Sequence, residues 1–428
     1  MIGTTTYNNV EVFLNQLQDN EVHVQYQDEA TFWTSVVSQL PGEWVNQKGY
    51  EITSEFTPDN SHGYISAGGS NPMGGSNDYA KMYVGFTRYR KTIDLDNDTY
   101  ADLTSGKEST KVDFAKKLAR VNASAIREME EAAMGDGRGI KAVVGSGSTT
   151  SSIVLTTTQT TTPTSSKGAE FLNKNHRYAL YDSSNALREA NIVASAVAKG
   201  TSPTLTPQTT LGVTPASTDY LVYYDPGSGT SCNRVPRGLA YLVNNGSGLF
   251  QGLLRSDYPE LKSIVEDFAG VNLQPSDIMR IRGKKKYRSG TKNGKLNLIL
   301  LAPSQFESYS RSGINFLQLN VGQKWDGTVN EIAMGDGMIM ENVVVDEGFI
   351  YFLNKGDLYK IERRKWGFVK DATGTTFTKK SGTNGTGADG VYANLGQDCN
   401  LYIKDPRSHA VAQRVGTTDV ATSANSWS

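Results

Sequence analysis

The densest group of chemically active side chains is a run of basic residues between positions 280 and 295. Its members, with Tyr287 among them, are Arg280, Arg282, Lys284, Lys285, Lys286, Arg288, Lys292 and Lys295. Such a run can neutralise phosphates or the acidic surface of a partner protein. Lys and Arg are also favourable near the C-terminus of a helix, where a solvated face needs no partner. Three interpretations stay open here: a solvated helix end, a contact with another subunit, and a contact with nucleic acid.

Three carboxylates, Glu128, Glu130 and Glu131, form the second notable group. They fall at the end of a predicted helix, where negative charge opposes the helix dipole. This unfavourable placement predicts basic partners nearby, and we expect those partners on another chain.

The remaining candidates for chemistry are weak. His23, His62, His176 and His409 do not lie at metal-ligand spacing from one another, and the chain has no Walker A, H-E-x-x-H, G-x-S-x-G or paired C-x-x-C motif. The Gly-Ser-Gly triplets at 145–147 and 227–229 lack the Lys-Thr and helix start of a phosphate-binding loop, which favours flexible turns. The sequence therefore predicts no catalytic residue, no cofactor site and no metal site.

The element that carries the three acids is a long helix over Thr110–Met134. The segment has no Pro or Gly, and its apolar residues recur in steps of three and four at Phe114, Leu118, Val121, Ala125 and Met129, with Ile126 beside them. Thr110 is the expected N-cap and Gly135-Asp136-Gly137 the expected stop. Most globular helices have about 11–12 residues. We therefore expect this one to be a strut, with its apolar stripe on the sheet of its own domain.

Composition limits the class of protein. The chain has 428 residues, a net charge of −1 and 43 glycines, so it is no polycation that seeks nucleic acid as a whole. Two cysteines, Cys232 and Cys399, give no disulfide framework and suit a reducing compartment. No leader and no apolar run of membrane-spanning length is found, so we expect neither secretion by a signal peptide nor a membrane span.

Upstream of the long helix we expect two extended pieces. Residues 1–45 are polar with short apolar groups, including possible helices over Val10–Leu17 and Ala30–Leu40, and are predicted to be a docked arm. Residues 46–104 predict a long β-hairpin with strands over Gly49–Phe56 and Lys81–Leu95 and a Gly-rich tip. Because a two-stranded hairpin is barely stable alone, it is expected to lie against something else, such as another subunit.

Downstream, the pattern changes three times. Residues 105–167 hold the long helix and strands over Gly139–Val144 and Ser152–Thr157, and residues 168–232 predict an all-β block. Residues 233–347 predict an α/β unit, with helical character over Arg237–Val243, Tyr258–Phe268, Gln274–Arg282 and Ser304–Arg311 and a doubly buried strand over Leu296–Leu301. Residues 348–428 return to β. The fold class predicted is α+β.

This order of elements resembles the major capsid protein of tailed bacteriophages, with the Hong Kong 97-type fold. Local phrases carry the same resemblance: Arg237–Arg255 (RGLAYLVNNGSGLFQGLLR), Leu300–Tyr309 (LLAPSQFESY), and Gly348–Leu353 (GFIYFL) followed by Lys365-Trp366 and the turn at Asp371–Gly374. The resemblance implies that 1–45 is the N-terminal arm, 46–104 the extended loop and 105–167 a peripheral domain with its spine helix. It likewise implies that 168–232 is an inserted all-β module, 233–347 the axial domain, and 348–428 return strands to the peripheral domain followed by a tail.

The resemblance also implies a function and partners. Copies of the chain would form pentamers and hexamers of an icosahedral head in the virion, made in the host cytoplasm, around non-specifically held double-stranded DNA. Expected partners are the portal, cement or decoration proteins, and a separate scaffolding protein or none, since a fused scaffold is not expected. The predicted subunit-interface residues are Lys81, Tyr83, Phe86, Arg88, Arg90, Glu128, Glu130, Glu131, Arg280, Arg282, Lys284, Lys285, Lys286 and Arg288.

Two other classes stay open from the residues alone. A tail-tube or surface-layer subunit would share the Gly- and Thr-rich β composition, although the long helix and the α/β unit disfavour it. A β-rich hydrolase acting on carbohydrate would need carboxylates that converge in a cleft, and the sequence selects no such pair.

Overall fold

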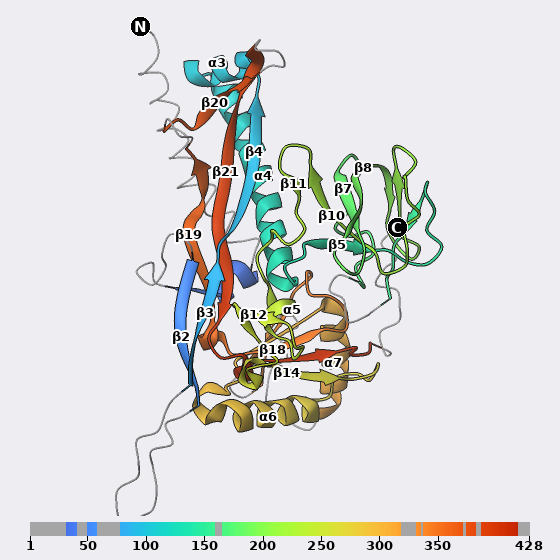
Figure 1. The fold of residues 1–428 in the computed structure, drawn as a ribbon, viewed down its shortest axis with the longest axis vertical. Coiled ribbons are helices and arrows are strands. Elements are labelled where there is room, and N and C mark those ends of the chain that lie inside the picture. The colour runs from blue at the N-terminus through green and yellow to red at the C-terminus, as the bar shows by residue number, and fades with distance from the viewer. Residues whose placement is uncertain are drawn as a thin grey trace, which may run out of the picture.

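The computed structural model of the chain describes residues 31–40, 49–57, 78–158, 165–317, 331–334, 337–370, 374–381 and 387–417. Within them the chain forms an elongated body, with a long sheet and a long helix side by side along its main axis (Figure 1). A β-module projects from the side of the helix, and an α/β layer lies at the end opposite α3. Among the described residues, no helix is long and apolar enough to cross a membrane.

The long sheet is built around one strand near the C-terminus. β21 (Gly387–Ile403) pairs with β4 (Thr87–Leu95) along one edge and with β19 (Leu358–Val369) and β20 (Phe377–Ser381) along the other. The short β1 (Ser38–Gln39) adds a parallel strand outside β19. Residues some three hundred positions apart therefore meet, as where Thr87 lies opposite Cys399.

The predicted hairpin is confirmed in its two strands and wrong in its continuation. β2 (Gly49–Thr57) pairs antiparallel with β3 (Asp78–Gly85), and the predicted tip, residues 61–77, lies outside the described residues. The single strand expected over Lys81–Leu95 is instead two strands, because the chain leaves the hairpin at Phe86 and enters the long sheet as β4. The part expected to be hairpin up to residue 104 then forms helix α3 (Asn97–Ser105), closed by Gly106 at φ 84°.

The long helix is confirmed. α4 runs from Glu108 to Met134, so it begins two residues before the expected cap at Thr110, and Lys107 is the N-cap. Its stripe contacts two separate cores. Phe114 and Leu118 pack with Ile93 of the long sheet, while Ile126 and Met129 lie in the central core of the molecule. The helix therefore ties the far tip of the long sheet to the centre of the fold.

Before the sheet begins, the chain makes a short turn against α4. The expected helix over Ala30–Leu40 is a π-helical turn, η2 (Thr31–Val36), whose Phe32 and Trp33 are fully buried. The expected helix over Val10–Leu17 lies outside the described residues.

The all-β block is confirmed as a module of seven strands, and it takes more of the chain than expected. Its strands are β5 (Ile140–Val143), β6 (Ile153–Val154), β7 (Arg177–Tyr181), β8 (Leu187–Ala198), β9 (Thr204–Pro207), β10 (Tyr220–Asp225) and β11 (Gly229–Thr230). β5 pairs with β10, and β6 with β9. These two strands were expected in the peripheral domain, but their apolar faces are buried in the core of this module.

The α/β unit is a six-stranded sheet flanked by two helices. The strand order is β14 (Ile264–Asp267), β22 (Ala410–Gln413), β18 (Ile350–Leu353), β15 (Leu298–Leu301), β17 (Gly337–Glu341) and β16 (Glu331–Met334). The helices are α6 (Pro275–Asn293) and α7 (Pro303–Leu317). β15 is central and buried on both faces, as its apolar run predicts.

Two predictions for this unit are wrong. β18 and β22 belong to this sheet and not to the long one, so the segment after residue 348 supplies both sheets. The helix expected over Tyr258–Phe268 is a single turn, η4 (Pro259–Leu261), followed by strand β14. The expected helix over Arg237–Val243 is the short α5 (Leu239–Leu242), followed by the small hairpin of β12 (Leu249–Phe250) and β13 (Leu253–Leu254).

Candidate assembly surfaces

The acidic end of α4 is satisfied within the chain. Glu130 is buried, and its Oε1 accepts hydrogen bonds from the Phe32 N–H at 3.3 Å and from Asn342 Nδ2 at 2.6 Å, while Oε2 accepts from the Trp33 N–H at 3.0 Å. Burial raises the pKa of this carboxyl, and the three hydrogen bonds oppose that rise. The predicted interface role of Glu130 is therefore wrong: it joins η2, α4 and the segment after β17.

The two flanking acids have partners delivered by neighbouring strands. Glu128 accepts from Lys91 Nζ at 3.1 Å and from the Tyr89 hydroxyl at 2.8 Å, both on β4. Glu131 pairs with Lys141 Nζ of β5 at 2.5 Å and with Arg127 Nε at 3.3 Å. The basic partners expected for these acids exist, but they lie on the same chain. Lys141 and Asn342 were not singled out in the sequence, since only the fold brings them to the helix.

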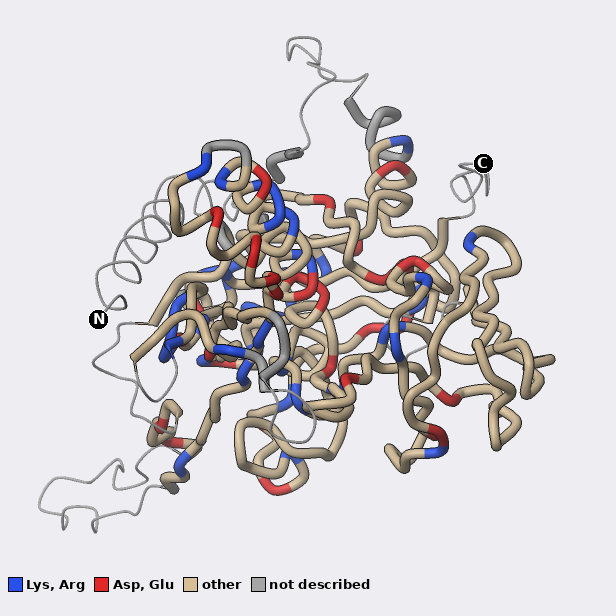
Figure 2. The backbone as a smooth tube through the Cα atoms, turned by 90° about the horizontal axis from the view of Figure 1, so that it is seen from above, with Lys and Arg blue, Asp and Glu red and all other residues tan. Residues whose placement is uncertain are grey.

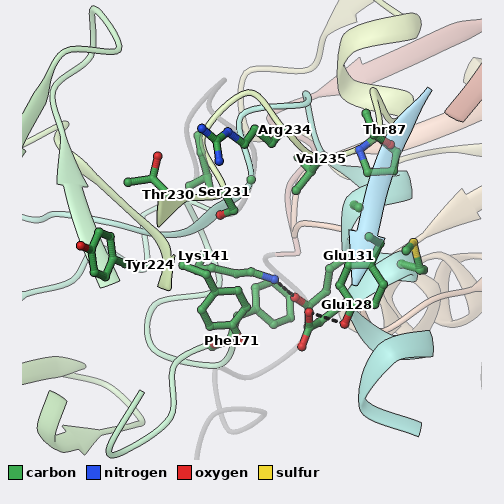
Figure 3. Close-up of a pocket in the computed structure, with 18 of the residues that line it drawn as sticks. Thr87, Glu128, Glu131, Lys141, Phe171, Tyr224, Thr230, Ser231, Arg234 and Val235 are labelled. Carbon is green, nitrogen blue, oxygen red and sulfur yellow. Dashed lines mark hydrogen bonds and ion pairs between the residues drawn. The ribbon is translucent and has the colours of Figure 1, made fainter. Parts of the chain in front are cut away.

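A cavity of about 630 Å³ lies where the end of α4, strand β4 and the β-module meet. Figure 3 shows Glu128 and Glu131 on one wall, Lys141 and Phe171 along the floor, and Thr230, Ser231 and Arg234 opposite. Lys141 Nζ also lies 4.5 Å from the centre of the Tyr223 ring. The acids that face the cavity from α4 are thus already paired, so the cavity is a gap between the module and the helix rather than a cluster of free carboxylates. Within the described part of the chain, no group of three or more His, Cys, Asp or Glu could hold a metal.

The hairpin displays one outward face. Tyr79, Lys81 and Tyr83 of β3 are exposed, and Lys81 Nζ lies 3.2 Å from Glu51 across the hairpin, whereas Met82 and Val84 between them are buried. Tyr83 is 43% exposed even though its N–H donates to the Gln251 carbonyl. Exposed tyrosines on a rigid strand are typical of protein interfaces. Lys81 and Tyr83 therefore remain candidates for contact with a neighbour.

The three other predicted interface residues near the hairpin, Phe86, Arg88 and Arg90, differ in exposure and in their contacts within the chain. Arg88 is exposed and lines the cavity. Arg90 is bound within the chain, where it donates to Asp398 Oδ1 at 2.6 Å and to the carbonyls of Tyr89 and Gln397. Phe86 packs partly buried beside Tyr50 and Tyr402. Of these three, only Arg88 is free to meet another subunit without a change in the fold.

The basic run lies on α6 except for Lys295, which follows the end of the helix. Figure 2 shows Lys and Arg interspersed with Asp and Glu elsewhere along the tube. Glu266 of β14 pairs with Arg280 and with Lys284, each at 2.6 Å. Lys286 is half-buried and Arg288 is exposed. These residues fit a surface, whereas Lys285 does not. Its side chain is 0% exposed, so its predicted interface role is wrong.

Lys285 lies inside the α/β unit. Its Nζ donates to the carbonyls of Lys295 at 3.0 Å and Phe352 at 3.3 Å. Burial lowers the pKa of its ammonium group to about 7, against the attraction of Asp357. His409, also fully buried, has a pKa held well below its ordinary value by burial and by Lys285, so it stays neutral around pH 7.

A Lys285→Met variant is expected to remove a pH dependence of stability. Between pH 7 and the ordinary lysine pKa near 10.5, the unfolded chain binds a proton that the folded chain does not, so wild-type stability rises with pH. From pH 7 to pH 9 this gain should be about 2 kcal/mol in urea unfolding. Lys285→Met should lose the gain and be no less stable at pH 7, because the desolvation cost disappears. Lys286→Met is the matched control and should keep the rise of unfolding free energy with pH. The same rise in Lys285→Met would contradict this account.

Arg255 is a second buried cation, and its role cannot be read from the sequence alone. Arg255, within the phrase Arg237–Arg255, donates to the carbonyls of Leu249, Leu261, Tyr241 and Leu242, and its guanidinium lies 4.9 Å from the Phe250 ring centre. It therefore satisfies the carbonyls at the end of α5 and closes the loop around the β12–β13 hairpin.

Comparison with known proteins identifies the fold. No family model and no curated protein sequence matches the chain. Of 118 matching chains of solved structures, one from the capsid of cyanophage A-1(L) has a TM-score of 0.51 at 12% identity, covering 90% of this chain and 93% of that one. Two further matches have lower scores. The SrpI encapsulin of Synechococcus elongatus PCC 7942 has a TM-score of 0.43 at 9% identity, covering 92% of this chain and 91% of that one. The capsid of a native GTA particle has a TM-score of 0.42 at 9% identity, covering 91% of each chain. The architecture is that of the Hong Kong 97-type capsid proteins.

Proposed function

We propose that this chain, whose fold is the Hong Kong 97-type capsid fold, is the major capsid protein of a tailed bacteriophage. The observation that carries the proposal is the match to the cyanophage A-1(L) capsid over nine-tenths of both chains, which leaves no large part of either fold outside the comparison. Copies would assemble into pentamers and hexamers of an icosahedral head around double-stranded DNA, so the role is structural rather than catalytic.

The described surfaces suit that role. The hairpin offers an outward face with Tyr79, Lys81 and Tyr83, and the α/β layer offers α6. At both places the described residues include exposed aromatic side chains next to cations. In this proposal β2–β3 is the extended loop, α4 with the long sheet the peripheral domain, and the six-stranded sheet the axial domain. The portal, cement or decoration proteins and a separate scaffolding protein are the further partners we propose, with the virion as the final location and the host cytoplasm as the place of synthesis.

The direct test is electron microscopy of the purified full chain at rising concentration. We expect rings and closed shells. Tyr83→Ser should stay folded and yet raise the concentration needed for shells by roughly tenfold or more, because an interface tyrosine typically contributes on the order of 2 kcal/mol. Leu187→Ser is the matched control, since Leu187 is 52% exposed on the β-module, away from the hairpin.

The outcomes separate the remaining classes. A compact monomer at all concentrations would refute the capsid role. Helical tubes without closed shells would instead favour a tail-tube or surface-layer subunit.

A further inference from the structure

One face of α6 is unusually open for a helix that packs on a sheet. Tyr287 is 92% exposed and Met279 is 61% exposed, and Gly283 lies between them with no atom within 4 Å of its would-be Cβ. Positions 279, 283 and 287 are four residues apart, so they share one stripe along the helix. The stripe is a shallow surface with an apolar residue at each end.

The charges beside this stripe are only partly neutralised. Arg280 pairs with Glu266 at 2.6 Å and with Asp277 at 3.0 Å, and Lys284 pairs with Glu266 at 2.6 Å, so these two cations are neutralised. Lys286, Arg288 and Lys295 meet no carboxylate within the part of the chain that the structure describes. The C-terminal half of α6 therefore carries surplus positive charge around the exposed Tyr287 ring.

The same chain holds a segment of opposite character. Residues 1–30 contain no Lys or Arg, and their acids are Glu11, Asp19, Glu21, Asp28 and Glu29. Within them Val10, Phe13, Leu14 and Leu17 recur in steps of three and four, which is the spacing of one helical stripe. The segment therefore complements the α6 face: its acids match the surplus positive charge, and its apolar residues match Met279 and Tyr287.

We propose that residues 1–30 of a copy of this chain dock on the outward face of α6, with the acids near Lys286, Arg288 and Lys295 and the apolar stripe on Met279 and Tyr287. The described chain begins at Thr31, where η2 is fixed to Glu130. Thirty residues can extend over roughly 100 Å, so the segment can reach its own α6 or that of a neighbouring copy. This contact goes beyond the proposed capsid role, since it does not require a closed shell.

The test places a photoreactive benzoylphenylalanine at Tyr287 of the full-length chain. After illumination, mass spectrometry is expected to find cross-links to peptides from residues 1–30. Lys286→Glu combined with Arg288→Glu should lower the yield fivefold or more, by roughly the effect expected when attraction becomes repulsion. Adding Glu11→Lys and Asp19→Lys to that variant should restore it. Raising NaCl from 50 mM to 500 mM should weaken the cross-link, because salt screens exposed charges.

Controls define what would overturn the proposal. The same probe at Leu187 should give no cross-link to residues 1–30. Cross-links from position 287 only to other segments, a yield unchanged by the charge reversals, or cross-links to added duplex DNA in place of residues 1–30 would each refute docking by this segment. Copies that carry the probe at natural isotope abundance are then mixed with isotope-labelled copies that lack the probe. Cross-links to labelled peptides from residues 1–30 would show that the docked segment comes from a neighbouring copy, and cross-links to unlabelled peptides alone would show that it comes from the same chain. The shells seen by microscopy are scored separately, so failure here leaves the capsid proposal unaffected.

Discussion

Leu118→Asp is expected to abolish folding of the long-sheet domain. Leu118 is fully buried on α4 and packs with Ile93, Leu95 and Leu395 of the sheet. A carboxylate at this position should lower the free energy of unfolding by about 4 kcal/mol or more, because a charge would be buried in an apolar cluster and the apolar contacts of Leu118 would be lost. We expect insoluble protein, or a melting temperature too low to measure, and no shells.

Two substitutions on the same helix calibrate this result. Val121→Asp should be damaging but milder, since Val121 is half-buried at the edge of the same core. Lys117→Ala should change stability by less than about 0.5 kcal/mol, because Lys117 is exposed and only donates to the Asp94 carbonyl at 2.6 Å. A Leu118→Asp protein with the same melting temperature as the wild type would show that the apolar stripe of α4 does not face the sheet.

Glu130→Ala is the second substitution with a large expected effect. It removes the acceptor for two buried backbone N–H groups and for the Asn342 amide, and each orphaned donor costs about 1–3 kcal/mol. The loss should be about 3 kcal/mol or more in urea unfolding. Because the carboxylate fixes η2, limited proteolysis should also cut near residues 31–40 in the variant before the rest of the chain.

The neighbouring acid supplies the control. Glu128→Ala loses the ion pair with Lys91, in which each side chain is 24% exposed, and the hydrogen bond from Tyr89, and should cost about 1 kcal/mol. Stability of Glu130→Ala within 0.5 kcal/mol of wild type would mean that Glu130 is not the anchor of the N-terminal turn.

The position of a charged residue on its helix predicts its burial better than its membership in a run of like charges does. Glu130 is four residues after Ile126 and three before Ala133, and Lys285 is four after Ile281, so both stand on apolar faces. As members of charge runs, they are predicted to lie at a surface. Judged by their position on the helix, they are buried and must find polar partners inside the chain.

Local pattern sufficed for the existence of most elements but not for their pairing. Lys81–Leu95 is a continuous β-prone run, so its sequence does not show a break at Phe86. The break arises because the part before Phe86 pairs with β2 and the part after it pairs with β21. Likewise β18 and β22 read as ordinary strands, while the choice of the six-stranded sheet over the long sheet depends on which apolar surfaces meet in three dimensions.

The position of β21 in the chain has a consequence for synthesis on the ribosome. The central strand of the long sheet, β21, consists of residues 387–403, whereas its partner β4 leaves the ribosome some three hundred residues earlier. Until translation is almost complete, β4 has no neighbour on that edge, and the core around Phe114 and Leu118 of α4 lacks Val391, Ala393 and Leu395 of β21. Nascent chains would therefore gain this domain only near release, which delays any contact that needs it and makes the unfinished chain a natural client for chaperones.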